Sequence, residues 1–253
     1  MQPATIATVQ FEPVLGDSEA NFDRMDEHLV GLSDEVAMAV FPELNVSGYD
    51  LDLVESEAEP IPGQSTERLV ELAADHDVHL VAGMPERAGS DVFNDLVYVS
   101  PSGYEASYRK RRLWGDETET FATGADPVVA ETPIGTVGLL VCYDLNFPEL
   151  AIEYGTMGAD ILVVSAAWRP DFLQDWQLLL RARALDTTSY VVASNHVGEQ
   201  AGRNHAGHSM IVKPDGTIGA ELETDPGSAT ASISPDELQE ARERNPVLEY
   251  RQE

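Results

Sequence analysis

The chain has 253 residues, a formal net charge of −30 and 43% hydrophobic residues. This length and apolar content suit one globular domain and exclude an intrinsically disordered chain. The acidic excess would repel nucleic acid phosphates and anionic lipids, so we expect neither as a partner. The longest apolar runs, at 137–141 and 161–165, are far shorter than the ~20 residues that a membrane-spanning helix needs.

The charge balance itself is unusual, with 45 acidic against 15 basic residues, of which only Lys110 and Lys213 are lysines. Such a composition is similar to that of proteins from salt-accumulating halophiles, in which concentrated salt screens the self-repulsion of the fold. A melting temperature that stays unchanged after dialysis into low salt would contradict this hypothesis. The N-terminus carries no secretory signal, so we expect a cytoplasmic protein.

Strand-like and helix-like segments alternate along the chain, which is typical of an α/β layered domain. In the first half the sequence predicts strands at 4–11, 37–43, 79–84, 95–100 and 104–110, and helices at 18–32 and 64–76. In the second half it predicts strands at 134–144, 160–168, 190–198, 208–214 and 228–234, and helices at 148–157, 172–186 and from 235 onward. No linker or composition shift divides the chain.

Cys142 is the only cysteine, which excludes an internal disulfide and any site built from several cysteines. It ends an apolar predicted strand and precedes a turn and a helix that Pro148 opens. A thiol near a helix N-terminus can have a lowered pKa and act as a nucleophile. A lone cysteine can equally be a small buried apolar residue, so its position alone leaves both interpretations open.

Lys110 and Glu43 are the other candidates for chemistry. Lys110 lies inside the basic run 108–112 (YRKRR), which indicates a need for a compact ammonium group where arginine is otherwise accepted. Glu43 follows a predicted buried strand, where desolvation would raise its pKa towards that of a useful general base. The alternative for Lys110 is a solvated basic face, and the alternative for Glu43 is a position on the solvated acidic surface.

Other catalytic patterns are incomplete. His205 and His208 have a spacing that suits a metal ion, but no acidic residue lies between or close after them. The segment 207–211 (GHSMI) lacks the last glycine of a Gly-x-Ser-x-Gly nucleophile motif, and no phosphate-binding glycine loop is present. We therefore expect neither a metal nor another cofactor.

Taken together, these residues resemble the nitrilase superfamily of carbon–nitrogen hydrolases. Three blocks stand in the order of that family, at 41–49 (FPELNVSGY), 108–117 (YRKRRLWGDE) and 141–149 (VCYDLNFPE). Shorter similarities lie at 181–184 (RARA), 207–209 (GHS) and 214–216 (PDG). Any single block is a weak signal, but three in order over nearly the whole chain are highly specific.

The resemblance implies a four-layer α-β-β-α sandwich in a single domain over residues 1–253. It also implies a homodimer or a larger homo-oligomer that pairs across the helices covering the sheets. We further expect the C-terminal segment, about 235–253, to contribute to the dimer contact.

The resemblance implies a catalytic site made by Glu43, Lys110 and Cys142. The Cys142 thiolate would attack a carboxamide carbon, while Glu43 would carry protons and later activate the water that cleaves the thioester. Lys110 and the backbone N–H of Tyr143 would stabilise the oxyanion, an effect worth about 3–4 kcal/mol per donor.

Four further residues follow from the same resemblance. Glu117 matches a second glutamate that positions the lysine, and Glu119 is the rival because the spacing after the lysine is uncertain by two residues. Trp168 and Asn195 are candidate pocket walls, with core packing or strand ends as the alternative.

The expected function is hydrolysis of a small linear amide, as an amidase or ω-amidase, with release of ammonia. The alternatives are an N-carbamoyl amidohydrolase, a nitrilase and a non-catalytic scaffold. A nitrilase is disfavoured because Tyr143 stands where those enzymes carry a tryptophan after the cysteine. Arg111 and Arg112 are candidates for contacting a substrate carboxylate, with an outward, solvated role as the alternative.

Overall fold

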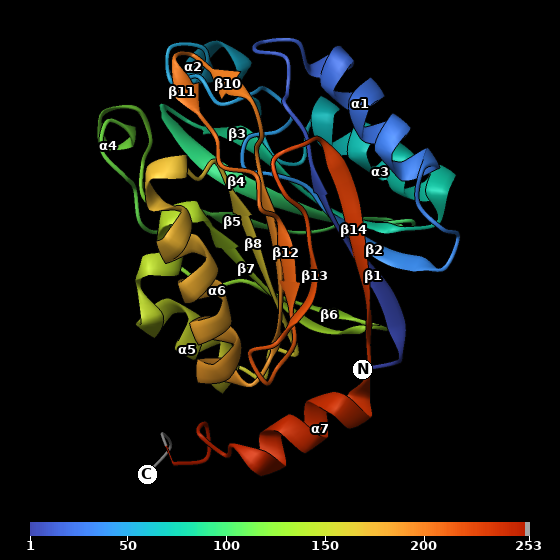
Figure 1. The fold of residues 1–253 in the computed structure, drawn as a ribbon. Coiled ribbons are helices and arrows are strands. Elements are labelled where there is room, and N and C mark those ends of the chain that lie inside the picture. Colours follow the sequence, from blue (N-terminus) through green and yellow to red (C-terminus); the bar gives the residue numbers. More distant parts are fainter. Residues whose placement is uncertain (251–253) are drawn as a thin grey trace.

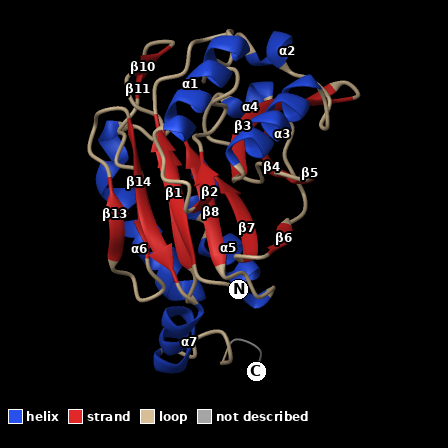
Figure 2. Cartoon of the chain, turned by 90° about the vertical axis from the view of Figure 1, so that its right-hand side faces the viewer, coloured by secondary structure: helices blue, strands red, loops and turns tan. Residues whose placement is uncertain are grey.

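A computed structural model describes residues 1–250 of the chain. Within that part, two six-stranded β-sheets lie face to face (Figure 1; Figure 2). The strand order is β14-β1-β2-β3-β4-β5 in the first sheet and β13-β12-β9-β8-β7-β6 in the second. Strands β10 and β11 form a short separate ribbon.

The bounds of the elements are as follows. The strands of the first sheet are β1 (Ala4–Gln10), β2 (Val36–Val40), β3 (His79–Ala88), β4 (Asp91–Ser100), β5 (Gly103–Arg109) and β14 (Gly227–Ile233). The other strands are β6 (Val129–Thr132), β7 (Gly135–Val141), β8 (Ile161–Ala166), β9 (Tyr190–Asn195), β10 (Glu199–Gln200), β11 (Arg203–Asn204), β12 (Met210–Val212) and β13 (Ile218–Glu221). The helices are α1 (Ser18–Val30), α2 (Val54–Glu57), α3 (Gln64–His76), α4 (Glu117–Thr120), α5 (Pro148–Thr156), α6 (Leu173–Thr187) and α7 (Pro235–Arg244), with 3₁₀ turns η1 (Cys142–Asn146) and η2 (Pro170–Phe172).

Three buried apolar clusters separate the layers. Ile6 of the first sheet and Leu139 of the second belong to the cluster between the sheets. Phe22 of α1 and Leu69 of α3 pack on the outer face of the first sheet, and Trp176 of α6 belongs to the cluster that covers the second sheet. Figure 1 shows the two helix pairs on opposite sides of the sheets. The predicted four-layer α-β-β-α sandwich is confirmed.

The two-residue period of each strand produces these layers, because successive side chains point to opposite faces of a sheet. In β1, Ile6 joins the cluster between the sheets, while Ala7 and Val9 join the cluster under α1 and α3. The hydroxyl of Thr8 also faces the second sheet and donates to the carbonyl of Ala193 at 2.8 Å. Both faces of the strand are therefore buried, and its sequence is almost entirely apolar or small.

Strands β3 and β4 extend further than the sequence predicts. They continue to Ala88 and begin at Asp91, so a short turn joins them into one long hairpin. Pro85 and the charged residues after it hide this extension, because proline and charged residues are depleted in strands. The pairing is nevertheless supported at Glu86, whose carboxylate accepts from the Arg109 guanidinium of β5 at 2.7 Å. The sequence also misses the short strands β6 and β13.

The three candidate residues follow strands that end at the same edge of the sandwich. β1, β2 and β3 are parallel to one another, as are β7, β8 and β9. Glu43 comes after β2, Lys110 directly after β5 and Cys142 directly after β7. Stacking the two sheets with these ends together therefore brings residues from distant parts of the chain to one place.

Helix α7 lies beyond the ends of the sheets, close to the N-terminus (Figure 1). Leu238 and Ala241 are buried, and Arg242 pairs with Asp160 at 3.0 Å. Residues 251–253 of the expected contact segment lie outside the described residues, and its role in a dimer stays a prediction. No helix within residues 1–250 is long and apolar enough to cross a membrane.

A buried carboxyl group on β4 makes the stability of the fold depend on pH. Asp95 is fully buried and neither of its carboxyl oxygens has a hydrogen-bond partner among residues 1–250. Burial, together with the nearby charge of Glu86, holds the pKa of Asp95 well above its usual value. A carboxyl group whose pKa is higher in the folded than in the unfolded state stabilises the fold fully only below its pKa in the unfolded state. This stabilisation is lost as the pH rises through its pKa in the folded state.

We therefore expect Asp95→Asn to stabilise the protein increasingly from pH 5 to pH 8. At pH 8 the gain should be roughly 2–4 °C in Tm, which corresponds to ~1 kcal/mol for a chain of this size. The measurement is the Tm of both proteins across that pH range. Asp91→Asn, at an exposed position of the same strand, is the control for simple loss of one negative charge. An equal gain from both variants at every pH would contradict the role of Asp95.

Candidate active site

Glu43 and Lys110 meet in the interior at the edge where the strands end. The Nζ atom of Lys110 lies 2.7 Å from Oε1 of Glu43 and 2.7 Å from Oε1 of Glu117. All three side chains are at most 1% exposed. Cys142 lies close enough for the charges of Glu43 and Lys110 to act on its thiol, and it remains partly exposed to a cavity. The structure thus brings together the three residues that the sequence singled out.

Glu117, and not Glu119, is the second glutamate at this site. Besides Lys110, its carboxylate accepts from the Tyr49 hydroxyl at 2.6 Å and from the Trp114 backbone N–H at 2.7 Å. Glu119 lies on the exposed face of the short helix α4. The two-residue ambiguity of the sequence is therefore resolved by which side of one helical turn faces the interior.

Glu43 is held by three donors. In addition to Lys110, its carboxylate accepts from Asn94 Nδ2 at 2.7 Å and from the backbone N–H of Ala167 at 2.8 Å. Burial raises the pKa of Glu43, and the positive charge of Lys110 opposes that rise. The sequence did not single out Asn94 or Ala167. Asn94 lies inside strand β4 and Ala167 directly follows β8, and no local pattern shows that either residue bonds to a carboxylate from another part of the chain.

Lys110 keeps its proton in this setting. Burial alone would lower the pKa of the ammonium, but the two carboxylates of Glu117 and Glu43 outweigh it and hold that pKa well above the usual value. Two of the three N–H donors are used on these carboxylates. The third donor has no hydrogen-bond acceptor among residues 1–250 and is available to a group that approaches Cys142.

Cys142 begins the tight turn η1 with a left-handed backbone, at φ +45°. A residue other than glycine rarely adopts this conformation, and its cost is met where surrounding contacts fix it. Asp144 supplies such contacts, because its buried carboxylate accepts from the Val141 N–H at 3.0 Å, the Arg112 N–H at 2.8 Å and the Tyr108 hydroxyl at 2.8 Å. Burial raises the pKa of Asp144 to about 6. Asp144 appeared in the sequence only as part of an acidic turn.

The thiol of Cys142 differs from the sequence expectation. A nearby helix N-terminus was expected to lower its pKa, but burial and the negative charge of Glu43 raise the pKa well above the usual value, against the attraction of Lys110. The nearest helical turn is the short 3₁₀ segment η1, whose dipole is small. The cysteine of the free protein is therefore a neutral thiol that needs a base.

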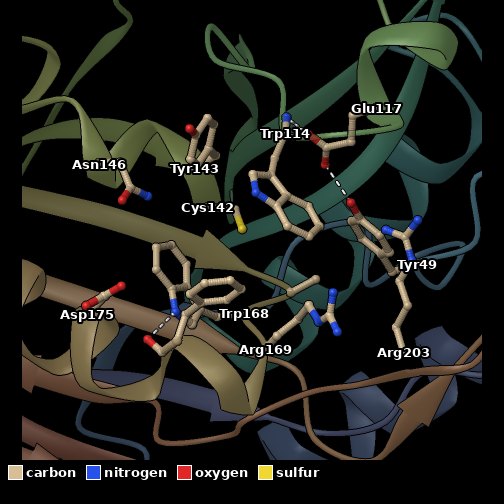
Figure 3. A pocket seen from close by; sticks show the side chains of 12 residues that line it. Tyr49, Trp114, Glu117, Cys142, Tyr143, Asn146, Trp168, Arg169, Asp175 and Arg203 are labelled. Atoms are coloured by element: carbon tan, nitrogen blue, oxygen red, sulfur yellow. Dashed lines mark hydrogen bonds between the residues drawn. The ribbon is translucent and has the colours of Figure 1, made fainter.

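A cavity of about 250 Å³ opens in front of Cys142. Figure 3 shows the cysteine sulfur pointing toward the aromatic side chains of Trp114 and Trp168. The lining residues are Tyr49, Trp114, Glu117, Cys142, Tyr143, Asn146, Ala167, Trp168, Arg169, Phe172, Asp175 and Arg203. Five of these twelve residues are aromatic, so the cavity suits a small ligand with an apolar middle.

Of the predicted pocket residues, Tyr143 and Trp168 line this cavity and Asn195 does not. Asn195 is fully buried behind the wall, where its side-chain oxygen accepts from the Trp168 N–H at 2.6 Å and its amide donates to the Gly207 carbonyl at 2.8 Å. Asn195 thus fixes the backbone of Trp168 by a hydrogen bond but does not reach the cavity.

Arg111 and Arg112, the sequence candidates for a substrate carboxylate, lie elsewhere. Arg111 pairs with Glu153 at 2.6 Å, and the guanidinium of Arg112 lies 5.0 Å from the centre of the Phe147 ring. Two other arginines, Arg169 and Arg203, line the cavity instead. Sequence reasoning missed them because each stands in a loop or short ribbon without a motif.

The structure gives His205 and His208 different neighbours. Within residues 1–250, no cluster of three or more His, Cys, Asp or Glu side chains is arranged to hold a metal ion. His205 is nearly buried beside the rings of Tyr49 and His196. His208 lies 3.5 Å from Glu221 instead.

Comparison with known proteins agrees with this geometry. A sequence model of the carbon–nitrogen hydrolase family matches residues 5–243. The 2-oxoglutaramate amidase of Bacillus subtilis is 32% identical over 249 residues, which cover 97% of this chain and 96% of that protein. A superfamily protein from Xanthomonas campestris, crystallised with an arsenic adduct in its active site, superposes with a TM-score of 0.92 at 27% identity, over 98% of this chain and 97% of that one.

A further structure is that of a cysteine-to-alanine mutant of the amidase from Nesterenkonia sp. AN1 in complex with butyramide. It superposes with a TM-score of 0.86 at 27% identity, and the match covers 95% of each chain. The family match spans almost all of the described chain, and the matched relatives are covered over nearly their full length. This protein is therefore a member of the carbon–nitrogen hydrolase family.

Proposed function

We propose that this protein is an amidase that hydrolyses the C–N bond of small linear amides through a thioester on Cys142. The observation that carries the proposal is the ammonium of Lys110 held between the carboxylates of Glu43 and Glu117, beside a thiol that faces a cavity. The amidase names of the relatives from Bacillus subtilis and Nesterenkonia sp. support the same reaction class.

The first half of the reaction uses the neutral thiol. Glu43 accepts the proton of Cys142 as the sulfur attacks the amide carbon, which leaves a neutral carboxyl group and removes the repulsion that raised the pKa of the thiol. The resulting oxyanion accepts the remaining N–H of Lys110 and the backbone N–H of Tyr143. Glu43 then passes its proton to the departing nitrogen, the C–N bond breaks, and ammonia leaves a thioester.

The second half repeats these steps with water. The carboxylate of Glu43 removes a proton from a water molecule that attacks the thioester carbon. The same two donors hold the second oxyanion. The carbon–sulfur bond breaks, the proton returns to the sulfur, and the carboxylic acid leaves. Glu43 thus needs to be ionised at the start of each half, and Lys110 stays charged throughout.

The proposal is tested by ammonia release from simple amides, ω-amides, N-carbamoyl amino acids and nitriles in molar KCl. Turnover of amides, with an acylated Cys142 trapped by acid quench and found by mass spectrometry, is the expected result. An N-carbamoyl amidohydrolase would release carbon dioxide as well, and a nitrilase would prefer nitriles. A protein that turns over none of these compounds would contradict the proposal.

The pH dependence of this reaction should have an acid limb set by Glu43. Only the ionised carboxylate accepts the thiol proton, and burial raises the pKa of Glu43 above its usual value. We therefore expect kcat/KM to fall about tenfold per pH unit below that raised value, beginning at a higher pH than an ordinary glutamate would give. The measurement is kcat/KM from pH 4 to pH 9, with the fold monitored by circular dichroism.

The exposed Glu119 provides a matched control for this limb. Glu119→Gln should leave the position of the acid limb unchanged, whereas Glu43→Gln should remove almost all activity at every pH. A rate that stays level down to pH 4 in folded protein would rule out Glu43 as the base.

A further inference from the structure

His196 is a buried titratable residue beside the proposed site that the reaction does not use. It directly follows β9 and is fully buried. Its ring Nε2 is hydrogen-bonded to the backbone carbonyl of Glu43, and its Nδ1 has no hydrogen-bond partner among residues 1–250. The ring thus makes one hydrogen bond, and that bond goes to the residue that acts as the base.

The chemistry of the two partners fixes the direction of this bond. A carbonyl oxygen can only accept, so Nε2 carries the proton and the neutral ring has its lone pair on Nδ1. Burial, with a smaller contribution from the neighbouring His205, lowers the pKa of His196 to about 3. At neutral pH His196 is therefore a permanent donor and not an acid–base group.

The ring of His196 is fixed in turn by its own surroundings. Its centre lies 5.1 Å from that of the His205 ring, and the backbone N–H of His196 donates to the carbonyl of Ala166 at 3.2 Å. Ala166 ends β8, and the next residue, Ala167, donates to the Glu43 carboxylate at 2.8 Å. The ends of β8 and β9 together therefore hold both the backbone and the side chain of Glu43.

The peptide bond after Glu43 needs this support. Leu44 has a left-handed backbone, with φ at +49°, and is fully buried; a leucine rarely adopts this conformation, which persists where surrounding contacts fix it. One face of the peptide lies against Gly83, where a Cβ atom would overlap the Leu44 nitrogen and lie 2.8 Å from the Glu43 carbonyl carbon. The carbonyl edge is held by His196. Rotation of this peptide would change the direction in which the Glu43 side chain leaves the backbone.

We propose that His196 is a positioning residue, which acts through the backbone carbonyl of Glu43 to hold its carboxylate where it can accept the Cys142 proton. This inference rests on the proposed amidase reaction, in which Glu43 is the base in both halves. Proton transfer depends steeply on the position of the base, since a misplacement of about 1 Å can lower a rate about 100-fold. His196 does not line the cavity in front of Cys142, so its loss should slow the chemical steps and leave substrate binding nearly unchanged.

The experiment separates the hydrogen bond from the bulk of the ring. A glutamine amide nitrogen reaches about as far from the backbone as the ring Nε2, whereas an asparagine amide reaches only as far as Nδ1, and phenylalanine keeps a ring without a donor. On the simple amide that the parent hydrolyses best, we expect His196→Asn and His196→Phe to lower kcat at least about tenfold, with KM changed by less than about threefold. His196→Gln should recover most of the lost kcat.

His79→Asn provides a matched control. His79 begins β3 and is half-buried, and its Nδ1 is hydrogen-bonded to the Tyr98 hydroxyl at 2.7 Å. This variant also removes a histidine hydrogen bond within the fold, but the bond does not involve Glu43, so kcat should stay nearly unchanged. Circular dichroism and Tm show whether each variant folds, and His196→Phe keeps the test valid where His196→Asn does not fold.

Alkylation of Cys142 by iodoacetamide gives a second measure that needs no amide turnover. Because Glu43 accepts the thiol proton, His196→Asn and His196→Phe should be alkylated at least about threefold more slowly at pH 7 than the parent and His196→Gln. If the parent hydrolyses no amide, the proposed function fails, and the alkylation rates alone decide the role of His196.

Three results would overturn the role of His196. One is an equal rate in the parent and the folded Asn and Phe variants by either measure. Another is a loss that His196→Gln does not recover. The third is failure of both His196→Asn and His196→Phe to fold, because the hydrogen bond would then hold the fold and not the base.

Discussion

Cys142→Ala is expected to reduce amide hydrolysis by at least about 10⁴-fold and to leave the fold intact. The sulfur is the only atom in the proposed site that forms a bond to the substrate, and no second cysteine exists to replace it. Alanine removes one atom from a cavity wall, and its packing loss is small. Cys142→Ser should be nearly as inactive, because a serine hydroxyl with the same base is a far weaker nucleophile at this pH.

The measurement combines ammonia release with intact-protein mass spectrometry after acid quench. The parent should show an acylated species during turnover, and both variants should show none. Far-ultraviolet circular dichroism and Tm close to those of the parent would establish that the loss is chemical. Activity of Cys142→Ala within about tenfold of the parent would remove Cys142 as the nucleophile.

Lys110→Arg is expected to lower kcat/KM by at least about 10³-fold, although it keeps the positive charge. The lysine nitrogen bonds to two carboxylates at 2.7 Å each in a site that is at most 1% exposed. A planar guanidinium is larger and cannot occupy the position of a single nitrogen between Glu43 and Glu117. It would push the two glutamates apart, and the donor for the oxyanion would be misplaced.

The second lysine of the chain provides the matched control. Lys213 pairs with Glu237 at 2.6 Å on the surface, with both side chains 36% exposed. Lys213→Arg should therefore leave kcat/KM unchanged within about twofold, since surface pairs tolerate this exchange. A Lys110→Arg enzyme within a few-fold of the parent would show that charge alone is sufficient and that the compact ammonium is not required.

The acidic surface, the oligomer and the cellular location stay predictions. The charge of −30 is a property of composition, and its link to high salt is tested only by measuring stability against salt. The expected dimer would pair two copies of the chain through the helices that cover the sheets. Leu178 of α6 and Phe172 beside it are among the exposed apolar side chains.

Most of the fold could be predicted from sequence because its layers arise from local periods. The helix over 64–76 has the predicted bounds, since its apolar residues recur at helical spacing. The strands with unbroken apolar runs, such as β8, were also found. The extension of β3 through Pro85 was not, because its support comes from Arg109, a residue on another strand. Local patterns miss strands that are stabilised by partners distant in sequence.

The site divides in the same way. Glu43, Lys110 and Cys142 could be singled out because each stands in a motif at the end of a strand or is rare in this composition. The choice of Glu117 over Glu119 required the orientation of α4. The direction of the pKa shift at Cys142 required the distribution of buried charge around it. Neither is encoded in a run of neighbouring residues.

The sequence by itself determined the alternation of strands and helices, the acidic composition and the choice of three candidate residues for chemistry, because periodicity, composition and short motifs are local properties of the chain. Only the tertiary structure decided what surrounds those groups. Asn94 and Ala167 bond to Glu43, Asp144 fixes the turn of Cys142, and Arg169 and Arg203 face the cavity. These contacts join residues from separate strands and loops, and they exist only after two sheets stack with the ends of their strands together.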